Sequence, residues 1–334
     1  MTGQRKREGE KFQTELIVLH LSHTEDLDPK VLSRMQSLVT VCGLLLLCSV
    51  QAHVVNDRND LPEDCKSFFY QGYVPEWETS DNYVYICQLF KNRYRFTTLY
   101  DTDHRIPVYS GYIVELGKQG TDPGKWFVEP QLIRSNLPDD MMIVKKLVEK
   151  KKVGLDEIKI KQAVDDDYKR LNNYNRGHLN PAGHHKGDAS KATYTLTNMV
   201  PQYKDLNNGL WSQYEKRIKT TCPDNKLFVL VGAIPSSNPQ RWIKNENRVN
   251  IPDYLWHAYC CVDNNNKPVK SGAAVAKNTE NNMVECSLDS LNKFFNKLNK
   301  KPKLFDNCNI NLPNTDPPKT KPPNPPGDCS GVVP

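Results

Sequence analysis

The chain has 334 residues, of which 38% are hydrophobic, 25% charged and 9% aromatic, an ordinary globular composition that argues against wholesale disorder. Its 45 basic and 39 acidic residues leave a net charge of +6, which permits a polyanionic partner without requiring one. The longest apolar run covers residues 38–50. It is shorter than the roughly 20 residues that a transmembrane helix needs, which argues against an integral membrane protein.

The N-terminal part of the chain predicts export. Residues 35–52 read MQSLVTVCGLLLLCSVQA, a short apolar core followed by small residues of the kind that precede a signal-peptidase site. We therefore expect a signal peptide at 35–52, with Met35 as the working start. Residues 1–34 would then be an alternative-start or non-native extension. The competing interpretation is a buried core helix. A signal peptide predicts a secreted, extracellular protein.

The cysteines agree with export. Cys42 and Cys48 lie inside the predicted signal peptide, and eight others follow it: Cys65, Cys87, Cys222, Cys260, Cys261, Cys286, Cys308 and Cys329. An even number of cysteines in an exported chain predicts disulfide bonds. Because eight cysteines can pair in about 105 ways, the sequence does not assign the pairs. Zinc is the competing interpretation, but the chain lacks the CxxC spacing that zinc sites usually show.

Residues 53–308 are expected to form one domain of mixed helices and strands. Hydrophobic spacing predicts strands at 105–116, 193–199, 227–234, 254–262 and 273–276, and helices at 206–220 and 288–299. The charge runs at 145–152 and 165–167 are expected on the solvated surface. Residues 309–334 hold eight prolines and predict an extended or disordered tail, with a polyproline ligand for a partner as the alternative.

The segment Asn175-Arg176-Gly177-His178 carries the residue types that phosphodiester chemistry needs. A neutral histidine can take a proton from an attacking water near neutral pH. An arginine offers a permanently charged, planar fork of donors to phosphate oxygens. The intervening glycine allows a close approach of backbone and substrate. Alone, this short pattern is weak, because three-residue matches arise by chance.

A second set of polar residues follows downstream. Asn207, Trp211 and Glu215 are spaced at i, i+4 and i+8, which on one helix would place them on one broad face. The amide and carboxylate oxygens of Asn207 and Glu215 suit Mg²⁺. The alternative is structural: Asn207 as a helix N-cap, Trp211 in the core and Glu215 in solvent.

Together these motifs resemble the DNA/RNA non-specific endonuclease family of ββα-metal nucleases. Residues 175–178 match its Asp-Arg-Gly-His motif except at the first position. Residues 197–202 match its Asn-x-x-Pro-Gln strand end, and Asn207 precedes Glu215 by the family's eight residues. The resemblance implies an α+β fold with a ββα-metal (His-Me finger) nuclease core, a mixed, mainly antiparallel sheet and flanking helices.

Three upstream segments, at 99–102, 105–110 and 126–132, resemble the secreted endonuclease domain-containing 1-like proteins of this family. The resemblance therefore extends over most of the predicted domain, from about residue 60 to about residue 300. It does not include the proline-rich tail.

The resemblance also implies a role for each site residue. His178 would be the general base that deprotonates the attacking water, and Arg176 would contact the phosphate and stabilise the transition state. Asn207 would be the only direct protein ligand of a hydrated Mg²⁺, with Mn²⁺ or another divalent cation as alternatives. Glu215 would hold water bound to that cation. Asn207 and the general base would flank the scissile phosphate.

The sequence departs from the family pattern at two positions. Asn175 stands where the family has aspartate, which removes a negative charge near the histidine. Lys219 stands where the family often has arginine, so the charge is kept but the donor fork is lost. Arg105 is a weaker candidate for a further phosphate contact. His184 and His185 are expected in a surface loop, either contacting phosphate or solvated.

These features favour a secreted, metal-dependent endonuclease that hydrolyses DNA and RNA without strong sequence preference. The alternative is a catalytically weak nuclease-like protein that binds nucleic acid or another partner without turnover. A third interpretation is a disulfide-braced structural protein. The sequence leaves open the preference between DNA and RNA, the physiological role and the oligomeric state, with a homodimer as one option.

Overall fold

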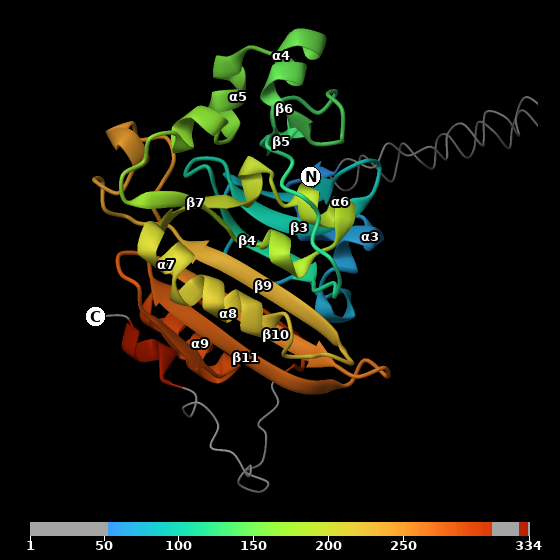
Figure 1. Ribbon diagram of the computed structural model, residues 1–334, viewed down its shortest axis with the longest axis vertical. Helices are drawn as coiled ribbons and strands as arrows, with labels where there is room; N and C mark the ends of the chain where they lie inside the picture. The colour runs from blue at the N-terminus through green and yellow to red at the C-terminus, as the bar shows by residue number, and fades with distance from the viewer. Residues whose placement is uncertain (1–52, 309–326, 333–334) are drawn as a thin grey trace, which may run out of the picture. The chain divides into compact units, whose positions relative to one another are not determined.

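An eight-stranded antiparallel sheet organises the molecule (Figure 1). The computed structural model describes residues 53–308 and 327–332, which all fall within one compact unit, Ala52–Pro334. The strand order is β1-β2-β3-β4-β9-β10-β11-β12, and each neighbouring pair is antiparallel. Two smaller antiparallel pairs, β5–β6 and β7–β8, lie outside this sheet. The predicted α+β class is confirmed.

The strands of the main sheet are β1 (Val54–Val55), β2 (Tyr83–Leu89), β3 (Tyr94–Asp101), β4 (Ile106–Ile113), β9 (Lys226–Ile234), β10 (Tyr254–Val262), β11 (Pro268–Lys277) and β12 (Met283–Cys286). The short pairs are formed by β5 (Phe127–Val128), β6 (Met142–Ile143), β7 (Tyr174–His178) and β8 (Met199–Tyr203). The helices are α3 (Glu63–Lys66), α4 (Val144–Lys151), α5 (Leu155–Lys161), α6 (Gly187–Ala192), α7 (Lys204–Asn208), α8 (Leu210–Ile218) and α9 (Leu288–Lys297). Four 3-10 helices bear on the site and the C-terminus: η4 (Asp165–Tyr168), η5 (Ala182–His184), η6 (Leu196–Asn198) and η8 (Cys329–Val332).

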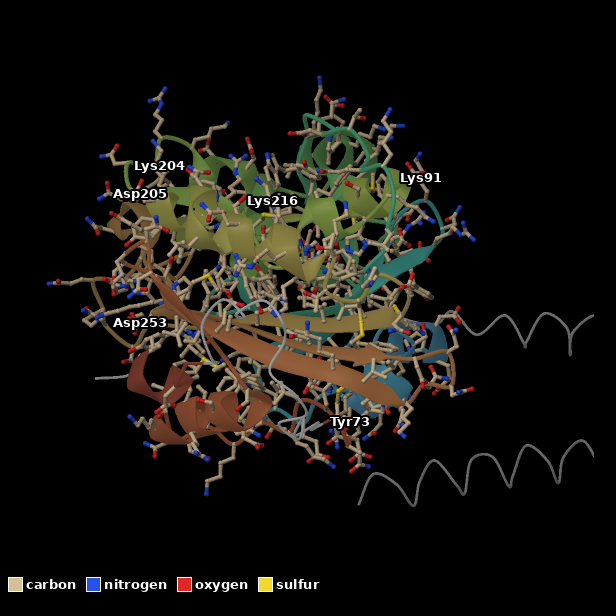
Figure 2. The ribbon with its side chains drawn as sticks, turned by 60° about the horizontal axis from the view of Figure 1, so that its bottom comes forward. Tyr73, Lys91, Lys204, Asp205, Lys216 and Asp253 are labelled. Carbon is tan, nitrogen blue, oxygen red and sulfur yellow. A yellow bond between two sulfur atoms is a disulfide. The ribbon has the colours of Figure 1, made fainter. Side chains whose placement is uncertain are left out.

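Both faces of the sheet are covered, which explains the unbroken apolar runs of the central strands. All nine residues of β10 are buried. Successive side chains of a strand point to opposite faces, so Trp256 packs with Phe295 of α9, whereas His257 packs with Tyr214 of α8. Figure 2 shows Lys204, Asp205 and Lys216, on α7 and α8, across the sheet from α9. The strands predicted at 105–116, 227–234, 254–262 and 273–276 and the helix predicted at 288–299 are confirmed.

The strand predicted at 193–199 is wrong, because strand β8 begins only at Met199. The preceding residues form η6, Leu196–Asn198. Here the buried Asn198 side chain donates from Nδ2 to the carbonyl oxygen of Thr193 at 3.0 Å. This bond folds back the segment that period-two alternation had suggested was extended.

The single helix predicted at 206–220 is also wrong. It is broken at Gly209, where φ is −104° and ψ is −117°. A Cβ at this position would lie 2.4 Å from the carbonyl oxygen of Asp205, so only glycine fits the break. Asn207 therefore lies on α7 and Glu215 on α8, and the argument that they share one face of a single helix does not hold.

The C-terminal segment departs from the tail prediction in part. Residues 327–332 return to the fold: Cys329 forms a disulfide with Cys286, and Lys297 of α9 donates to the carbonyl oxygen of Ser330 at 2.7 Å. Cys329 itself, the eighth member of an even set of cysteines, was the sequence signal for this return. Residues 309–326 and 333–334 lie outside the described residues, as do 1–52, so the signal peptide stays a prediction.

The disulfide prediction is confirmed. The four bonds are Cys65–Cys87, Cys222–Cys261, Cys260–Cys308 and Cys286–Cys329. They use all eight cysteines that follow the predicted signal peptide. Within residues 53–308 and 327–332, no helix has both the length and the apolar character needed to cross a bilayer.

Candidate active site

The predicted motif forms a β-hairpin followed by two short helices. Strand β7 pairs with β8 in antiparallel register, with Gly177 opposite Val200 and His178 opposite Met199. A Cβ at Gly177 would lie 2.5 Å from the Cβ of Gln202. We expected this glycine to let substrate approach, but what requires it here is the Gln202 side chain, which crosses over β7. The hairpin leads directly into α7 and then α8.

Asn198 holds the far end of the hairpin together. Its Oδ1 accepts hydrogen bonds from the Ser110 hydroxyl and the Asn180 backbone N–H, both at 3.0 Å. Its Nδ2 donates to the carbonyl oxygens of Asn180 and Thr193 at 2.9 and 3.0 Å. In addition, the Leu179 N–H donates to the Asn198 carbonyl oxygen at 3.0 Å. This fully buried amide therefore ties the residues that follow His178 to β4 and to the start of β8.

His178 lies between two aromatic rings. Its ring centroid is 4.9 Å from that of Tyr194, edge to face, and 5.8 Å from that of Trp126. Its Nε2 is buried and has no hydrogen-bond partner among the described residues. Burial lowers the pKa of His178 to about 4, against the opposing charge of Asp122. The imidazole is therefore neutral at physiological pH, with a ring nitrogen free to accept a proton.

Arg176 projects from the same side of β7 as His178, two residues away. Its guanidinium lies over the rings of Trp126 and Tyr168, at 4.7 and 5.7 Å from their centroids. Its Nη2 donates to the Asp165 carboxylate at 2.8 Å and to the Asp165 carbonyl oxygen at 3.0 Å. Its Nε is buried without a partner in the described structure. Arg176 therefore has a buried N–H donor that no described residue engages.

The acidic run at 165–167 is only in part the solvated surface that we predicted. Asp165 pairs with Arg176, as described above, and Asp167 is buried and forms an ion pair with Arg248 at 2.7 Å. Asp166 is exposed and Asp165 is partly exposed. The basic run at 145–152 does lie mainly on the surface, with only Leu147 of α4 buried.

Asn175 and Asn207 lie on neighbouring elements. The Asn175 amide donates to Oδ1 of Asn208, the residue after Asn207, at 3.5 Å, which holds α7 against β7. The Asn207 side chain is partly exposed and makes no hydrogen bond with any described residue. It lies inside α7, so the N-cap alternative for this residue is wrong.

Glu215 is partly buried on α8. Desolvation raises the pKa of its carboxyl to about 8, while the nearby Trp211 and Lys216 oppose the rise. Trp211 is buried in the core, as the structural alternative expected, whereas Glu215 is not simply solvated. Lys219 is the C-cap of α8. Burial lowers the pKa values of His184 and His185, and the charge of Lys219 adds a smaller lowering.

His184 and His185 are core residues, so their expected place in a surface loop is wrong. His184 bridges the Tyr112 hydroxyl at 2.9 Å and the Glu215 carbonyl oxygen at 2.8 Å. His185 Nε2 lies 2.6 Å from Oδ1 of Asn180. The segment Pro-Ala-Gly between His178 and these residues turns them inward through η5, so they brace α8 and the hairpin.

Arg105 lies in a different environment from the other candidates. Its guanidinium makes four hydrogen bonds to the backbone carbonyl oxygens of Asp103, Lys159, Ile160 and Arg248, at 2.8–3.0 Å. These bonds anchor the end of α5 and leave Arg105 little capacity to bind a phosphate. Its side chain therefore acts as a structural brace.

The side-chain oxygen groups of Asn207 on α7 and Glu215 on α8 are of the chemical type that binds a hydrated divalent cation. The Asn207 amide oxygen is free of hydrogen bonds to the described residues, and the Glu215 carboxyl is desolvated, with the Trp211 side chain as its hydrogen-bonding neighbour. Such hard oxygen groups suit Mg²⁺, which usually keeps several waters. The described chain offers no cluster of three His, Cys, Asp or Glu side chains for a metal. A cation bound here would therefore fill most of its coordination positions with water.

An antiparallel hairpin that carries a neutral histidine, followed by helices that carry Asn and Glu, is the core of a ββα-metal nuclease. The family model for DNA/RNA non-specific endonucleases matches residues 148–309, which include every one of these elements. The chain belongs to the DNA/RNA non-specific endonuclease family. Two positions that matter to the hairpin, Asn198 and Gln202, were part of the predicted motif but had no predicted role.

Two curated relatives share this region. The chain is 31% identical over 233 residues to the human endonuclease domain-containing 1 protein. This match covers 68% of this chain and 43% of the human protein. The chain is 31% identical over 228 residues to the Mus musculus protein of the same name, with 66% and 43% covered. The match thus spans less than half the length of these relatives. A chain in the crystal structure of the EndoG/EndoGI complex also aligns, with a TM-score of 0.40, 16% identity and coverage of 68% of this chain and 82% of that chain.

Proposed function

We propose that this protein is a secreted endonuclease that depends on a divalent cation, most simply Mg²⁺, and hydrolyses the phosphodiester bonds of DNA and RNA with little sequence preference. Membership of the non-specific endonuclease family supports the reaction class. Contacts to the phosphate backbone carry no base information, which accounts for a broad choice of substrates. The proposal concerns the described domain, 53–308 with 327–332.

In this proposal, His178 takes the proton of the attacking water, and Arg176 donates hydrogen bonds to the phosphate as negative charge develops. Asn175 and Lys219 contact the substrate backbone at the edge of the site. Asn207 would bind the cation directly and Glu215 through an intervening water. The cation would supply stabilisation of the developing charge and of the leaving oxygen. Arg105 has no part in the proposed reaction because its donors are engaged by carbonyl oxygens.

One observation carries the proposal. Nε2 of His178 and Nε of Arg176 are both buried and both lack a partner among the described residues, and the two side chains pack against the same indole ring. Leaving a buried polar group unpaired costs about 1–3 kcal/mol, so two such groups side by side point to a ligand that satisfies them. A phosphate with its attacking water would satisfy an arginine donor and a histidine acceptor together.

The direct test is digestion of supercoiled plasmid and of a structured RNA by the purified secreted chain. We expect cleavage of both with Mg²⁺ and none with EDTA. His178→Ala should lower kcat by about 100-fold or more, since a general base typically contributes 10²–10⁴. The matched control is His104→Ala, because His104 lies in a loop against Trp242. Intact plasmid with wild-type protein, or equal cutting by His178→Ala, would refute the proposal.

A second function is favoured by one substitution. Asn175 places a neutral amide, bonded to Asn208, where the family motif has a carboxylate, so the protein would bind nucleic acid with little turnover. Asn175→Asp separates the two functions. A gain in kcat of tenfold or more would favour the binding protein, and an unchanged kcat would favour the enzyme. Salt-sensitive binding without cleavage by wild type would also favour the binding protein.

Secretion has its own test. The four disulfides fit an oxidising compartment. Expression of the full chain in cultured cells should release the protein into the medium with His53 as its first residue. N-terminal sequencing would check the cleavage site. Retention of the whole chain inside the cell would contradict the proposed extracellular location.

A further inference from the structure

A tryptophan from outside the hairpin lies at the centre of the candidate active site. Trp126 immediately precedes β5, and its neighbour Phe127 is fixed by a backbone hydrogen bond to the Tyr194 carbonyl oxygen at 2.9 Å. A parallel bridge between Phe127 and Thr195 continues this attachment. The indole is therefore held by backbone hydrogen bonds beside Tyr194, with the two ring centroids 5.4 Å apart.

The same indole contacts both residues to which we assign the chemistry. Its centroid is 4.7 Å from the Arg176 guanidinium carbon and 5.8 Å from the His178 ring centroid. Tyr194 packs against His178 but not Arg176, and Tyr168 packs against Arg176 but not His178. In the described part of the chain, no other aromatic ring packs against both of these residues.

We propose that Trp126 is a positioning residue that sets the directions of the Arg176 guanidinium and the His178 imidazole toward one phosphate. This inference rests on the proposed function and gives a role to a residue that lies outside the motif at 175–178 and had no role in the sequence analysis. Arg176 and His178 are two residues apart on one edge strand, so their side chains project from the same side with free rotation about several bonds. Packing against a shared, backbone-anchored ring removes that freedom before substrate binds.

The contacts of Arg176 show how this positioning works. Asp165 accepts hydrogen bonds from Nη2 at one end of the guanidinium, while the rings of Trp126 and Tyr168 lie against it. A cation–π contact is strongest where water is excluded. The remaining donors, including the buried Nε, are thereby left for the substrate. Orientation of this kind is worth up to about 100-fold in rate for a displacement of 1 Å.

His178 also packs against the Trp126 indole. The groups that face it are Trp126, Tyr194 and, as the charged group, Asp122 from the segment before Trp126. None of these is a hydrogen-bond partner of Nε2. Aromatic packing therefore fixes the imidazole without consuming the nitrogen that the reaction needs.

The first experiment compares Trp126→Ala and Trp126→Phe in the full chain, with plasmid and with a short single-stranded oligonucleotide as substrates. A positioning role predicts that Trp126→Ala lowers kcat by about 10–100-fold and leaves KM within about threefold. Trp126→Phe should recover most of kcat, because a benzene ring still supports both side chains. Trp242→Phe is the matched control, since Trp242 stacks on His104 at 5.6 Å away from the hairpin, and it should leave both constants unchanged.

The second experiment needs no substrate and therefore separates this inference from the proposed function. In ¹⁵N-labelled protein, the Nε–H signal of Arg176, identified by its loss in Arg176→Lys, should exchange slowly with solvent. Trp126→Ala should accelerate that exchange at least tenfold and move the His178 ring-proton signals, through loss of the indole ring current. Trp126→Phe should preserve slow exchange even if the alanine variant folds poorly.

The outcomes are distinct. If wild type cleaves nothing but the Arg176 and His178 signals respond to Trp126→Ala as described, the proposed reaction fails and the positioning role stands. If Trp126→Ala raises KM and leaves those signals unchanged, the indole is a stacking surface for a nucleobase and the inference is overturned. Unchanged kcat, KM and spectra in Trp126→Ala would overturn it as well.

Discussion

The two faces of the main sheet bury different kinds of side chain. On the α9 face, the core is aromatic: Trp77 stacks on Trp256 with centroids 5.6 Å apart, and Phe295 packs edge-on against both. On the α8 face, the core includes polar groups, among them His184, His185 and the amides of Asn198 and Gln202. The aromatic face gains free energy by removing apolar area from water, whereas the polar face gives up part of that gain to desolvation.

This difference separates a face that stabilises the protein from a face that would act on a ligand. On the α9 side, the buried atoms without partners in the described structure are the indole nitrogens of Trp77 and Trp256 and the Tyr109 hydroxyl. On the α8 side they include both ends of the Gln202 amide, Nε2 of His178 and Nε of Arg176. Functional sites commonly hold polar groups in arrangements that cost stability, and here the apolar face offsets that cost.

The disulfides give the sharpest test of this division, because each face holds one with a similar span. Cys222–Cys261 spans 39 residues and ties the chain just after α8 to β10, whereas Cys286–Cys329 spans 43 residues beside α9. In each of two double variants, both cysteines of one disulfide are replaced by serine. Each variant should lose about 4 kcal/mol of unfolding free energy in urea titration, because the unfolded chain gains the entropy that the closed loop had removed. Only the Cys222→Ser/Cys261→Ser variant should also lower kcat, because α8 carries Glu215. Equal loss of kcat in both variants would contradict the comparison.

The next largest effect is expected at Asn198. Asn198→Ala removes four hydrogen bonds and leaves buried backbone groups of Asn180 and Thr193 without this partner, while the Ser110 hydroxyl keeps only Thr98. We expect a loss of about 3 kcal/mol in chemical denaturation, together with lower kcat at temperatures where the variant stays folded. Asn250→Ala is the matched control: Asn250 is also a buried amide, bonded only to the Ser236 backbone. A variant of Asn250 that reduced kcat as strongly would show that the effect is merely general destabilisation.

Gly177 tests the packing inside the hairpin. Gly177→Ala would place a methyl group within 2.5 Å of the Gln202 Cβ, an overlap that costs about 1–3 kcal/mol. The double variant Gly177→Ala/Gln202→Ala should recover part of this loss, which a double-mutant cycle measures as a coupling free energy. If the two substitutions are simply additive, the Gln202 side chain is not what requires glycine at 177.

Local patterns of apolar residues predicted a domain of mixed helices and strands and most of the long strands, whereas the ββα-metal core with its hairpin was implied by the resemblance to the nuclease family. It did not predict the break at Gly209 or the turn at Asn198, since each depends on one side chain or backbone atom meeting a group brought close by the fold. The inward position of His184 and His185 depends likewise on Tyr112 and on the Glu215 carbonyl oxygen. Trp126 lies about fifty residues before the motif, and no local pattern connects the two.

The last test uses pH, because the polar face alone holds buried histidines of lowered pKa. Burial lowers the pKa of His178 and His184 to about 4 and that of His185 to about 3, and it lowers the pKa of His257 well below its usual value. The unfolded chain takes up protons at these histidines below about pH 6.5, whereas the folded chain does not. The stability they contribute is therefore complete above that pH and is lost as the pH falls from 6.5 toward 4, by at most about 1.4 kcal/mol per pH unit for each histidine.

Glu215 should act in the opposite direction. Burial raises its pKa from 4.5 to about 8, so the folded state holds a proton that the unfolded chain releases, and the associated stability is lost as the pH rises from 4.5 to 8. We expect the unfolding free energy, measured by urea titration in EDTA, to rise between pH 4.5 and 6.5, because the several buried histidines contribute more to its pH dependence than Glu215 alone. Above pH 6.5 only the contribution of Glu215 remains, so the unfolding free energy should decline toward pH 8. Glu215→Gln should abolish the decline above pH 6.5, and His185→Gln should reduce only the slope below pH 6.5.

A wild-type pH profile that is flat from 4.5 to 8 would contradict this contrast, because it would show that the titratable groups on the α8 face are as well solvated as surface groups.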